Sequence, residues 1–430
     1  MLCYYFPPIG GAGTQRSSKL VKYLPRYGWM PTVIAGIDYT WPQDRTLLAD
    51  IPEGVEVHRL PLPVSVWRRA RHWMFGHRLG PVGWGQLANR LGWFLDFPCT
   101  KREWADTAAE MALHLCQYHS FDAIYASIPP FSLCSGIRRV QKELGIPWLL
   151  DFRDPWAGGK IGFDNLPAWL RRKHARAERD AVLHADAIAC AHPALAEALT
   201  RDYNLPAARC HVVFNGYDPD DFAHFPPLPS GTGRKCTFTH TGTLYSTYNA
   251  DALAKALRDH WSGPPAGTEE VEFRFVGGAG ETVFPEKRGL KVTVTPRVDH
   301  HTALHELAQA NVLLTTFDRR LYKTNISGKL FEYLASGRPI LGILPADGTM
   351  ADIIRECRAG WVADCDQPAQ IVETIHDVVR QVTQPGFRFE PDWDRVKQYS
   401  RAAQAGRMAA VLNQMVSQPG VARSPLGVVI

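Results

Sequence analysis

One stretch of the chain combines a helix start with a full positive charge. Residues 325–341 have the sequence NISGKLFEYLASGRPIL, which predicts a loop, a serine N-cap, a two-turn helix, a glycine C-cap and then a strand. At such a helix start the backbone N–H groups of Ser327 and Gly328 would point outward, and Lys329 would add its charge beside them. The pattern predicts a binding site for an anion.

Glu332 follows Lys329 by three residues, so both side chains would lie on the same face of that helix. The carboxylate would then either pair with the lysine or accept a hydrogen bond from a sugar hydroxyl. The alternative is a capped surface helix whose Lys–Glu pair is solvated and binds nothing.

A glycine-rich turn lies close to the N-terminus, where residues 7–16 have the sequence PPIGGAGTQR. Gly10 and Gly11 would let the backbone approach a phosphate closely at the start of the following helix. Two other interpretations remain open: a tight strand–helix turn without a ligand, and a dinucleotide fingerprint with Asp38 as the ribose ligand. Arg16, which stands where that fingerprint has its third glycine, disfavours the dinucleotide.

The segment from Val64 to Leu95 is basic and rich in tryptophan. It holds five arginines and four tryptophans but neither Asp nor Glu. Such a mixture suits the headgroup region of an anionic membrane. The alternatives are a structural Trp-rich loop and, last because no nucleic-acid motif accompanies it, a site for single-stranded nucleic acid.

Four further residues, Asp218 to Asp221, have the sequence DPDD directly after Asn215 and Gly216. A solvated turn is expected there rather than a metal-binding Asp-x-Asp, because Asp and Pro favour turns. We expect no metal.

Composition sets the frame for these motifs. With 430 residues, the chain suits two or three domains, and 45% hydrophobic and 21% charged residues are typical of a globular protein. No apolar run reaches the ~18 residues of a membrane span, and the start of the chain has no secretory signal pattern. The nine cysteines form no CxxC pair, which favours reduced thiols in the cytosol.

Short apolar runs alternate with helical stretches throughout, which predicts an α/β fold of doubly wound parallel sheets. Predicted strands are 2–6, 32–37, 55–60, 123–127, 148–152, 187–191, 211–214, 237–241, 272–276, 291–294, 312–316, 340–343 and 360–363. Predicted helices include 16–24, 104–118, 166–183, 251–259, 302–308, 329–335, 369–382 and 393–416.

The Pro- and Gly-rich residues 218–234 divide these elements into two halves of similar size. We expect a Rossmann-like domain over 1–217, a second one over 235–390, a C-terminal helix over 391–417 that packs back on the first domain, and a loose tail over 418–430. Ligands of such sheets bind beyond the carboxyl ends of the strands, so the site would lie in a cleft between the domains.

These motifs together resemble family 4 of the retaining glycosyltransferases, which have the GT-B fold of two facing Rossmann-like domains, and most of all its bacterial members that build cell-surface polysaccharides. The resemblance rests on the stretches at 7–16 and 329–339 and on the shorter sequences SIPP, DFRDPW, NGYD and TGTLY, which follow in the family's order at 127, 151, 215 and 241.

The resemblance implies a donor site for a nucleoside-diphosphate sugar. Glu332 would hold the ribose, with Ser327, Gly328 and Lys329 near the diphosphate and Gly11 reaching the donor from the first domain. The remaining implied donor contacts are the loop Thr241, Gly242 and Thr243 and, at the base pocket, Arg297 and Val298.

Three positions depart from the family's pattern. Thr324 stands where relatives often have the first of two glutamates, and the region around Tyr248 lacks a common arginine. Arg153 stands near the place of a catalytic-site histidine; it would either join an ion-pair cluster with Asp151 and Asp154 or oppose the charge on the leaving diphosphate.

The resemblance therefore predicts a retaining transfer to a hydroxyl of a glycan, expected to be lipid-linked, at the inner leaflet of the cytoplasmic membrane. No cofactor is expected, and Arg153, Lys329 and Glu332 are the predicted catalytic residues. A nucleotide-sugar epimerase of the same fold and a catalytically silent partner subunit stay open as alternatives.

Overall fold

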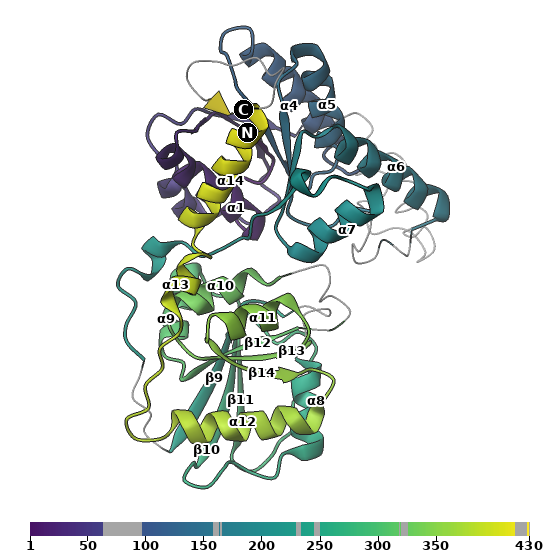
Figure 1. The fold of residues 1–430 in the computed structure, drawn as a ribbon. Coiled ribbons are helices and arrows are strands. Elements are labelled where there is room, and N and C mark those ends of the chain that lie inside the picture. Colours follow the sequence, from purple (N-terminus) through teal and green to yellow (C-terminus); the bar gives the residue numbers. More distant parts are fainter. Residues whose placement is uncertain are drawn as a thin grey trace, which may run out of the picture. The chain divides into compact units, whose positions relative to one another are not determined.

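The computed structural model describes residues 1–62, 97–157, 163, 166–228, 234–244, 250–317, 319, 326–417 and 428–429. The chain forms two compact units (Figure 1). Unit 1 comprises residues 1–214 and the chain from 404 onward, and unit 2 comprises residues 215–403. The expected linker 218–234 is grouped with unit 2.

Unit 1 is built on a seven-stranded parallel sheet with the order β4-β3-β1-β5-β6-β7-β8. Its strands are β1 (Leu2–Cys3), β3 (Val33–Ile37), β4 (Val57–Pro61), β5 (Ile124–Ile128), β6 (Trp148–Phe152), β7 (Ala187–Cys190) and β8 (Cys210–Val212). The helices are α1 (Ala12–Tyr23), α4 (Arg102–Leu115), α5 (Leu133–Leu144), α6 (Ala168–His184), α7 (Pro193–Tyr203) and α14 (Arg401–Val416). Every residue of β5 and β6 is buried, as expected for a parallel sheet covered on both faces.

Two short strands, β2 (Met30–Pro31) and β15 (Val428–Val429), form a separate parallel pair. Helix α14 is part of unit 1 from Gln404 onward. Gln404 accepts from the Phe214 N–H at 2.8 Å, Gly406 lies against the Tyr27 ring, and Asn413 accepts from Trp29 Nε1 at 2.9 Å.

Unit 2 has a six-stranded parallel sheet with the order β11-β10-β9-β12-β13-β14. The strands are β9 (Lys235–Thr241), β10 (Glu270–Val276), β11 (Leu290–Thr295), β12 (Val312–Thr316), β13 (Ile340–Leu344) and β14 (Gly360–Asp364). The helices are α8 (Asp251–His260), α9 (His300–Ala308), α10 (Gly328–Ala335), α11 (Thr349–Glu356), α12 (Pro368–Val382) and α13 (Trp393–Lys397). Helices α8 and α12 pack side by side over a core that contains the stacked rings of Phe238 and Phe273 (Figure 1).

These two parallel sheets confirm the predicted α/β fold class, but most predicted elements differ from the observed ones by a few residues at one end or both. The first strand ends at Cys3 rather than at residue 6, and the first helix begins four residues early, at Ala12. The predicted single helix over 393–416 is wrong. Tyr217 bonds the backbone at the break: its N–H donates to Tyr399 O at 3.1 Å, and its carbonyl accepts from Arg401 N–H at 2.6 Å.

Among the described residues, no helix combines the length and hydrophobicity needed to cross a bilayer. All nine cysteines are free thiols, and none is exposed.

Candidate functional site

In unit 2, the charge of Lys329 lies over a glycine. Helix α10 begins after Ser327, which occupies the N-cap position without donating or accepting a side-chain cap hydrogen bond. The Lys329 side chain passes over Gly242, since Lys329 Cε is 3.3 Å from the position that a Cβ at Gly242 would occupy. Gly242 has φ +117°, and its N–H donates to Val276 O at 2.7 Å. The predicted helix start and the predicted loop after β9 therefore form one site.

Tyr333, on α10, links this helix to the loop after β9. Its fully buried hydroxyl accepts a hydrogen bond from the Thr241 backbone N–H at 2.8 Å. Burial raises the pKa of Tyr333 to about 12, so the hydroxyl stays neutral. This hydrogen bond fixes the position of the loop after β9 relative to α10. Tyr333 lies inside the motif at 329–339, but no local pattern in the sequence indicates this contact.

Lys329 and Glu332 form the expected pair, with Nζ 3.1 Å from Oε2. The two side chains are 34% and 13% exposed, so the pair is neither fully solvated nor sealed in the core. Among the described residues, and apart from the helix's own backbone and the adjoining residues, no atom lies within 4 Å of a Cβ placed on Gly328. A ligand anion could therefore approach the first turn of α10 beside Lys329.

His240 is a buried neutral imidazole under the same loop. Its Nδ1 lies 3.0 Å from Leu314 O, and because a carbonyl only accepts, the proton is on Nδ1 and Nε2 carries the lone pair. Nε2 is 4.0 Å from the point that a Cβ on Gly242 would occupy. Burial and, to a lesser degree, the charge of Lys329 lower the pKa of His240 to about 4, although the hydrogen bond to Leu314 O acts in the opposite direction. The sequence offered no periodic or spacing signal for this residue.

Further loops meet at the carboxyl edge of the unit 2 sheet. A Cβ on Gly277, after β10, would lie 2.8 Å from the carbonyl carbon of Gly242, so these two loops touch backbone to backbone. Thr243 is exposed in the loop after β9, as is Arg297 after β11, whereas Val298 is half-buried. Arg297 and Val298 share this edge with the Lys329 site, but no hydrogen bond or ion pair between described residues links them to it.

In unit 1, Asp151 pairs with Arg16 and not with Arg153. Arg16 donates from Nε to Oδ2 at 2.8 Å and from Nη2 to Oδ1 at 2.6 Å, and Tyr125 also donates to this carboxylate. Arg16 and Asp151 are both buried. The proposed ion-pair cluster of Asp151, Arg153 and Asp154 is therefore corrected: the helix that follows the glycine turn supplies the cation.

Arg153 is held by backbone carbonyls. It donates from Nη2 to Pro129 O at 2.5 Å and from Nε to Ile128 O at 3.4 Å, and its guanidinium lies 5.4 Å from the centre of the Tyr5 ring. A Cβ on Gly13 would approach Nη1 to 1.8 Å. Gly13 is thus a glycine because the half-exposed Arg153 fills the space beside the first turn of α1.

The glycine turn itself is fixed by residues 41–44. The Gly10 N–H donates to Pro42 O at 2.7 Å, and Gly10 O accepts from Trp41 Nε1 at 3.1 Å. Gly11 is the N-cap of α1, with φ +110° and no side-chain cap hydrogen bond.

Asp38 does not suit the alternative role of a ribose ligand. It is 8% exposed and accepts from Tyr4, Thr40 and Lys101. Burial opposes its charge, but these three side chains outweigh burial and hold the pKa of Asp38 at about 2. Its oxygens are thus occupied within the fold.

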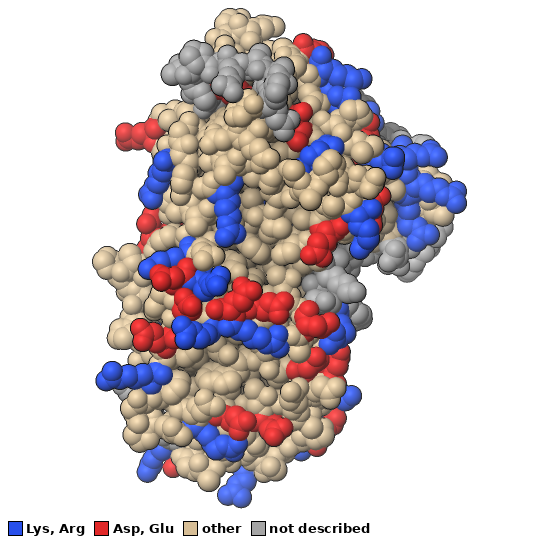
Figure 2. Space-filling view, viewed as in Figure 1, with Lys and Arg blue, Asp and Glu red and all other residues tan. Residues whose placement is uncertain are grey.

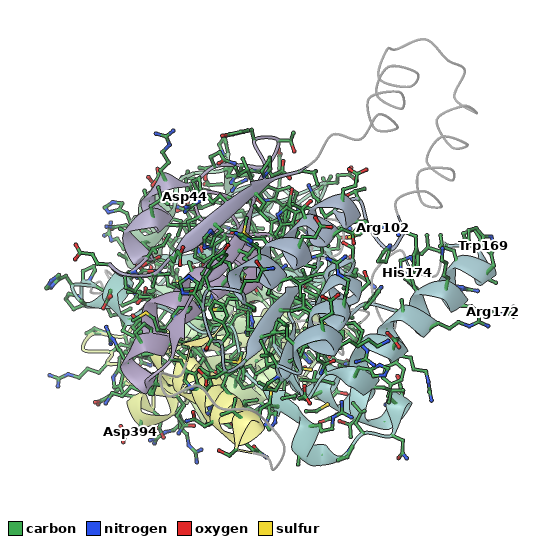
Figure 3. The ribbon with its side chains drawn as sticks, turned by 90° about the horizontal axis from the view of Figure 1, so that it is seen from above. Asp44, Arg102, Trp169, Arg172, His174 and Asp394 are labelled. Carbon is green, nitrogen blue, oxygen red and sulfur yellow. The ribbon has the colours of Figure 1, made fainter. Side chains whose placement is uncertain are left out.

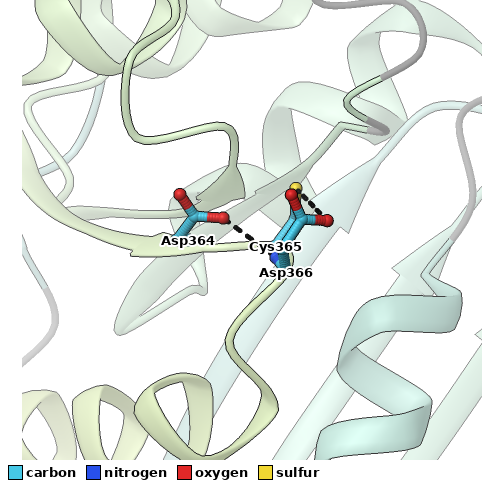
Figure 4. Close-up of side chains that lie close together, drawn as sticks. All are labelled: Asp364, Cys365 and Asp366. Carbon is cyan, nitrogen blue, oxygen red and sulfur yellow. Dashed lines mark hydrogen bonds between the residues drawn. The ribbon is translucent and has the colours of Figure 1, made fainter.

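Two acidic groups were also considered as metal ligands. Asp218 is buried and caps a short 3₁₀ turn by accepting from the Asp220 N–H at 3.2 Å; the turn is as predicted, but its first residue is not solvated. Asp364, Cys365 and Asp366 lie close together after β14 (Figure 4). Arg319 already pairs there with Asp347, Asp364 and Asp366, so this group is an ion-pair cluster.

Solved structures of similar shape share the two-domain architecture. The chain aligns with sucrose-phosphate synthase from Thermosynechococcus elongatus at a TM-score of 0.62 and 14% identity, over 96% of this chain and 98% of that one. It aligns with Anabaena HepE in complex with UDP at 0.56 and 12%, over 96% and 98%, and with the catalytic domain of Arabidopsis thaliana starch synthase IV at 0.59 and 10%, over 97% and 99%. These are GT-B structures, so the predicted fold is confirmed.

Family models decide the activity class. Residues 10–216 match the glycosyl transferase 4-like domain, and residues 235–381 match the glycosyl transferases group 1. The chain is a glycosyltransferase of the GT-B type. No curated protein matches it significantly.

Within this glycosyltransferase, unit 2 brings together six predicted donor residues at one site: Thr241, Gly242, Ser327, Gly328, Lys329 and Glu332. The predicted unit 1 residues, Gly10, Gly11 and Arg153, lie at the carboxyl edge of their own sheet. The departures at Thr324 and Tyr248 and the segment 64–95 lie outside the described residues.

Proposed function

We propose that this glycosyltransferase moves a sugar, with retention, from a nucleoside-diphosphate sugar to a hydroxyl of a lipid-linked glycan in cell-surface polysaccharide synthesis. The observation that carries the proposal is the position of Lys329, in the first turn of α10. Its Cε is 3.3 Å from the point that a Cβ on Gly242 would occupy. A cation, a helix N-terminus and a glycine loop meet there, which suits a diphosphate.

The Lys329–Glu332 pair supports a specific exchange of partners. When a donor binds, its diphosphate would take the place of Glu332 as the partner of Lys329, and the released carboxylate would accept hydrogen bonds from the ribose hydroxyls. As the sugar–phosphate bond breaks, charge grows on the diphosphate, and Lys329 together with the first-turn N–H groups would stabilise it. No obvious carboxylate nucleophile appears in the sequence, and the family resemblance implies attack from the face of the departing phosphate, which retains the configuration.

Three parts of the proposal rest on the family resemblance. Gly10, Gly11 and Arg153 would contact the donor from unit 1, and Arg297 and Val298 would line the base pocket. The reaction would need no metal. Similar structures hold UDP, UDP-glucose or ADP, which supports a nucleoside-diphosphate donor for this chain.

Because the proposed acceptor is lipid-linked, we expect the enzyme to work at the inner leaflet of the cytoplasmic membrane. The segment 64–95 would form one contact to anionic lipid. Its arginines would be attracted by the lipid charge, and its tryptophans would lie among the headgroups.

Incubation with each of a panel of nucleoside-diphosphate sugars, without acceptor, tests the function. We expect slow release of nucleoside diphosphate with the correct donor, and a raised melting temperature because that donor binds the folded state. An isomerised nucleotide sugar would show an epimerase instead. Neither binding nor turnover with any donor would indicate a silent partner subunit.

A further inference from the structure

Helix α6 (Ala168–His184) presents a basic stripe to solvent. Five cations lie on this helix: Arg171, Arg172, Lys173, Arg176 and Arg179. Its buried residues, among them Leu170, Ala181 and Val182, face the core. The exposed residues recur at helical spacing, so Arg172, Arg176 and Arg179 lie on one face. Figure 2 shows Lys and Arg gathered where α6 projects, at the right of the view.

Apolar side chains end the stripe in both directions. Trp169 is 49% exposed at the first turn, and Leu183 is 39% exposed at the last. In Figure 3, Trp169 and Arg172 lie together at the outer end of α6, away from the sheet. A row of cations with a tryptophan at one end suits the interface of a lipid bilayer, where the ring lies at headgroup level.

The two acidic side chains on α6 offset at most one of its five positive charges at the surface, because only Asp180 is exposed. Glu178 is buried, and its Oε2 accepts from the Ala157 N–H at 2.6 Å. Asp180 lies 3.2 Å from His184 Nδ1. No ion pair is seen for Arg172, Arg176 or Arg179 with the residues that the structure describes, so their charge is available to an external partner.

The helix is held firmly enough to act as a docking surface. His174 faces inward and accepts from Trp156 Nε1 at 3.0 Å. Its ring lies 4.8 Å from that of Phe97 and 5.4 Å from that of Phe163. The outer stripe is therefore presented by a helix whose inner face is packed.

We infer that the outer face of α6 docks on an anionic lipid surface through Trp169, Arg172, Arg176 and Arg179. The attraction would be strong at low salt, because phosphate headgroups and arginines are opposite charges, and would weaken as the Debye length falls to about 10 Å at 0.1 M. The inference adds a second surface to the contact proposed at 64–95 and requires no sugar chemistry.

Flotation of the full chain with vesicles tests the inference. One set contains about one-third phosphatidylglycerol in phosphatidylcholine, and the other contains phosphatidylcholine alone. We expect binding to the anionic set, and a partition coefficient at least about 100-fold lower for Arg172→Glu/Arg176→Glu/Arg179→Glu. A control triple in unit 2, Lys255→Glu/Lys287→Glu/Arg288→Glu, makes the same change in net charge at exposed positions and should bind like the parent.

Trp169→Ser separates the apolar contribution, because it should reduce the part of the binding that survives high salt. Circular dichroism and the melting temperature show that each variant is folded. The inference is overturned if the α6 triple binds like its control, or if binding ignores lipid charge. It is also overturned if the parent binds heparin or single-stranded RNA through the stripe but not the vesicles.

The rate of nucleoside-diphosphate release, measured in solution without vesicles, tests the proposed function separately from docking. An α6 triple that releases nucleoside diphosphate at the parent's rate but no longer floats supports the docking surface. A parent that floats but processes no donor leaves docking intact and refutes the transfer.

Discussion

Each unit of this glycosyltransferase has cations beside a glycine turn, but the two turns use them differently. In unit 2, Lys329 lies over Gly242 and pairs with the partly exposed Glu332. In unit 1, Arg16 follows the glycine turn and is buried in a two-bond pair with Asp151. A partner that a ligand can replace leaves a cation available for binding, whereas a sealed partner makes the cation part of the fold.

Among the residues that the structure describes, Arg153 is neither paired with a carboxylate nor free of protein contacts. Its guanidinium donates to the carbonyl groups of Ile128 and Pro129 and lies over the Tyr5 ring. Carbonyl partners hold a guanidinium in place without neutralising it. Of the two arginines near the unit 1 turn, Arg153 is therefore the one that could still meet a ligand anion.

The largest expected effect is on the sealed pair. Asp151→Asn would leave the buried Arg16 charge without its counter-charge, and we expect the free energy of unfolding to fall by about 3–5 kcal/mol. Urea denaturation measures this. Asp154→Asn, at an exposed position two residues away from the strand end, should change stability by less than about 0.5 kcal/mol. If both variants lost the same free energy of unfolding, the Arg16–Asp151 pair would not be the structural ion pair that distinguishes the unit 1 turn from the unit 2 turn.

Lys329→Ala tests the available cation. The fold should survive, since the lysine is 34% exposed, but kcat should fall by about 100-fold because the charge matters most as the diphosphate leaves. Lys255→Ala, at an exposed position on α8, is the control. Initial rates over a range of donor concentrations separate the outcomes. An unchanged kcat with a raised KM would make Lys329 a ground-state binding residue.

Local patterns predicted the Lys329–Glu332 pair beside its glycine loop, but not the Arg16–Asp151 pair. The N-cap, the glycines and the i, i+3 spacing from Lys329 to Glu332 are local features, and strand order brings their loops to one edge. The Arg16–Asp151 pair joins residues 135 positions apart, and no local rule reveals which carboxylate an arginine will choose. Only one of the two expectations for Arg153, the ion-pair cluster with Asp151 and Asp154, is therefore wrong, because Asp151 pairs with Arg16.

Two other failures have the same origin. The break between α13 and α14 depends on Tyr217, some 180 positions earlier, which bonds the backbone of Tyr399 and Arg401. His240 acquires its place under Gly242 by donating to Leu314 O on the neighbouring strand β12. In both cases a distant backbone group decides the outcome.

Glu332→Ala tests the exchange of partners proposed for Lys329. The variant loses the charge-assisted hydrogen bonds to the ribose, worth about 1.5–3 kcal/mol, so the donor KM should rise by about 10- to 100-fold. Glu373→Ala, at an exposed position on α12, is the matched control. If the Glu332 variant turned over like the parent at subsaturating donor, the carboxylate would be a partner of Lys329 and nothing more.

Tyr333→Phe makes the smallest change and tests whether the loop after β9 must be held in place against α10. The substitution removes the acceptor of the Thr241 N–H and leaves that buried donor unpaired, at a cost of about 1–3 kcal/mol to the folded state. Because Gly242 follows Thr241 directly, the loop under Lys329 should loosen, and the donor KM should rise several-fold while kcat changes less. Tyr118→Phe, at an exposed hydroxyl, serves as the control. A stability loss without any rise in KM would show that Tyr333 supports the core of unit 2 and that α10 alone positions the charge.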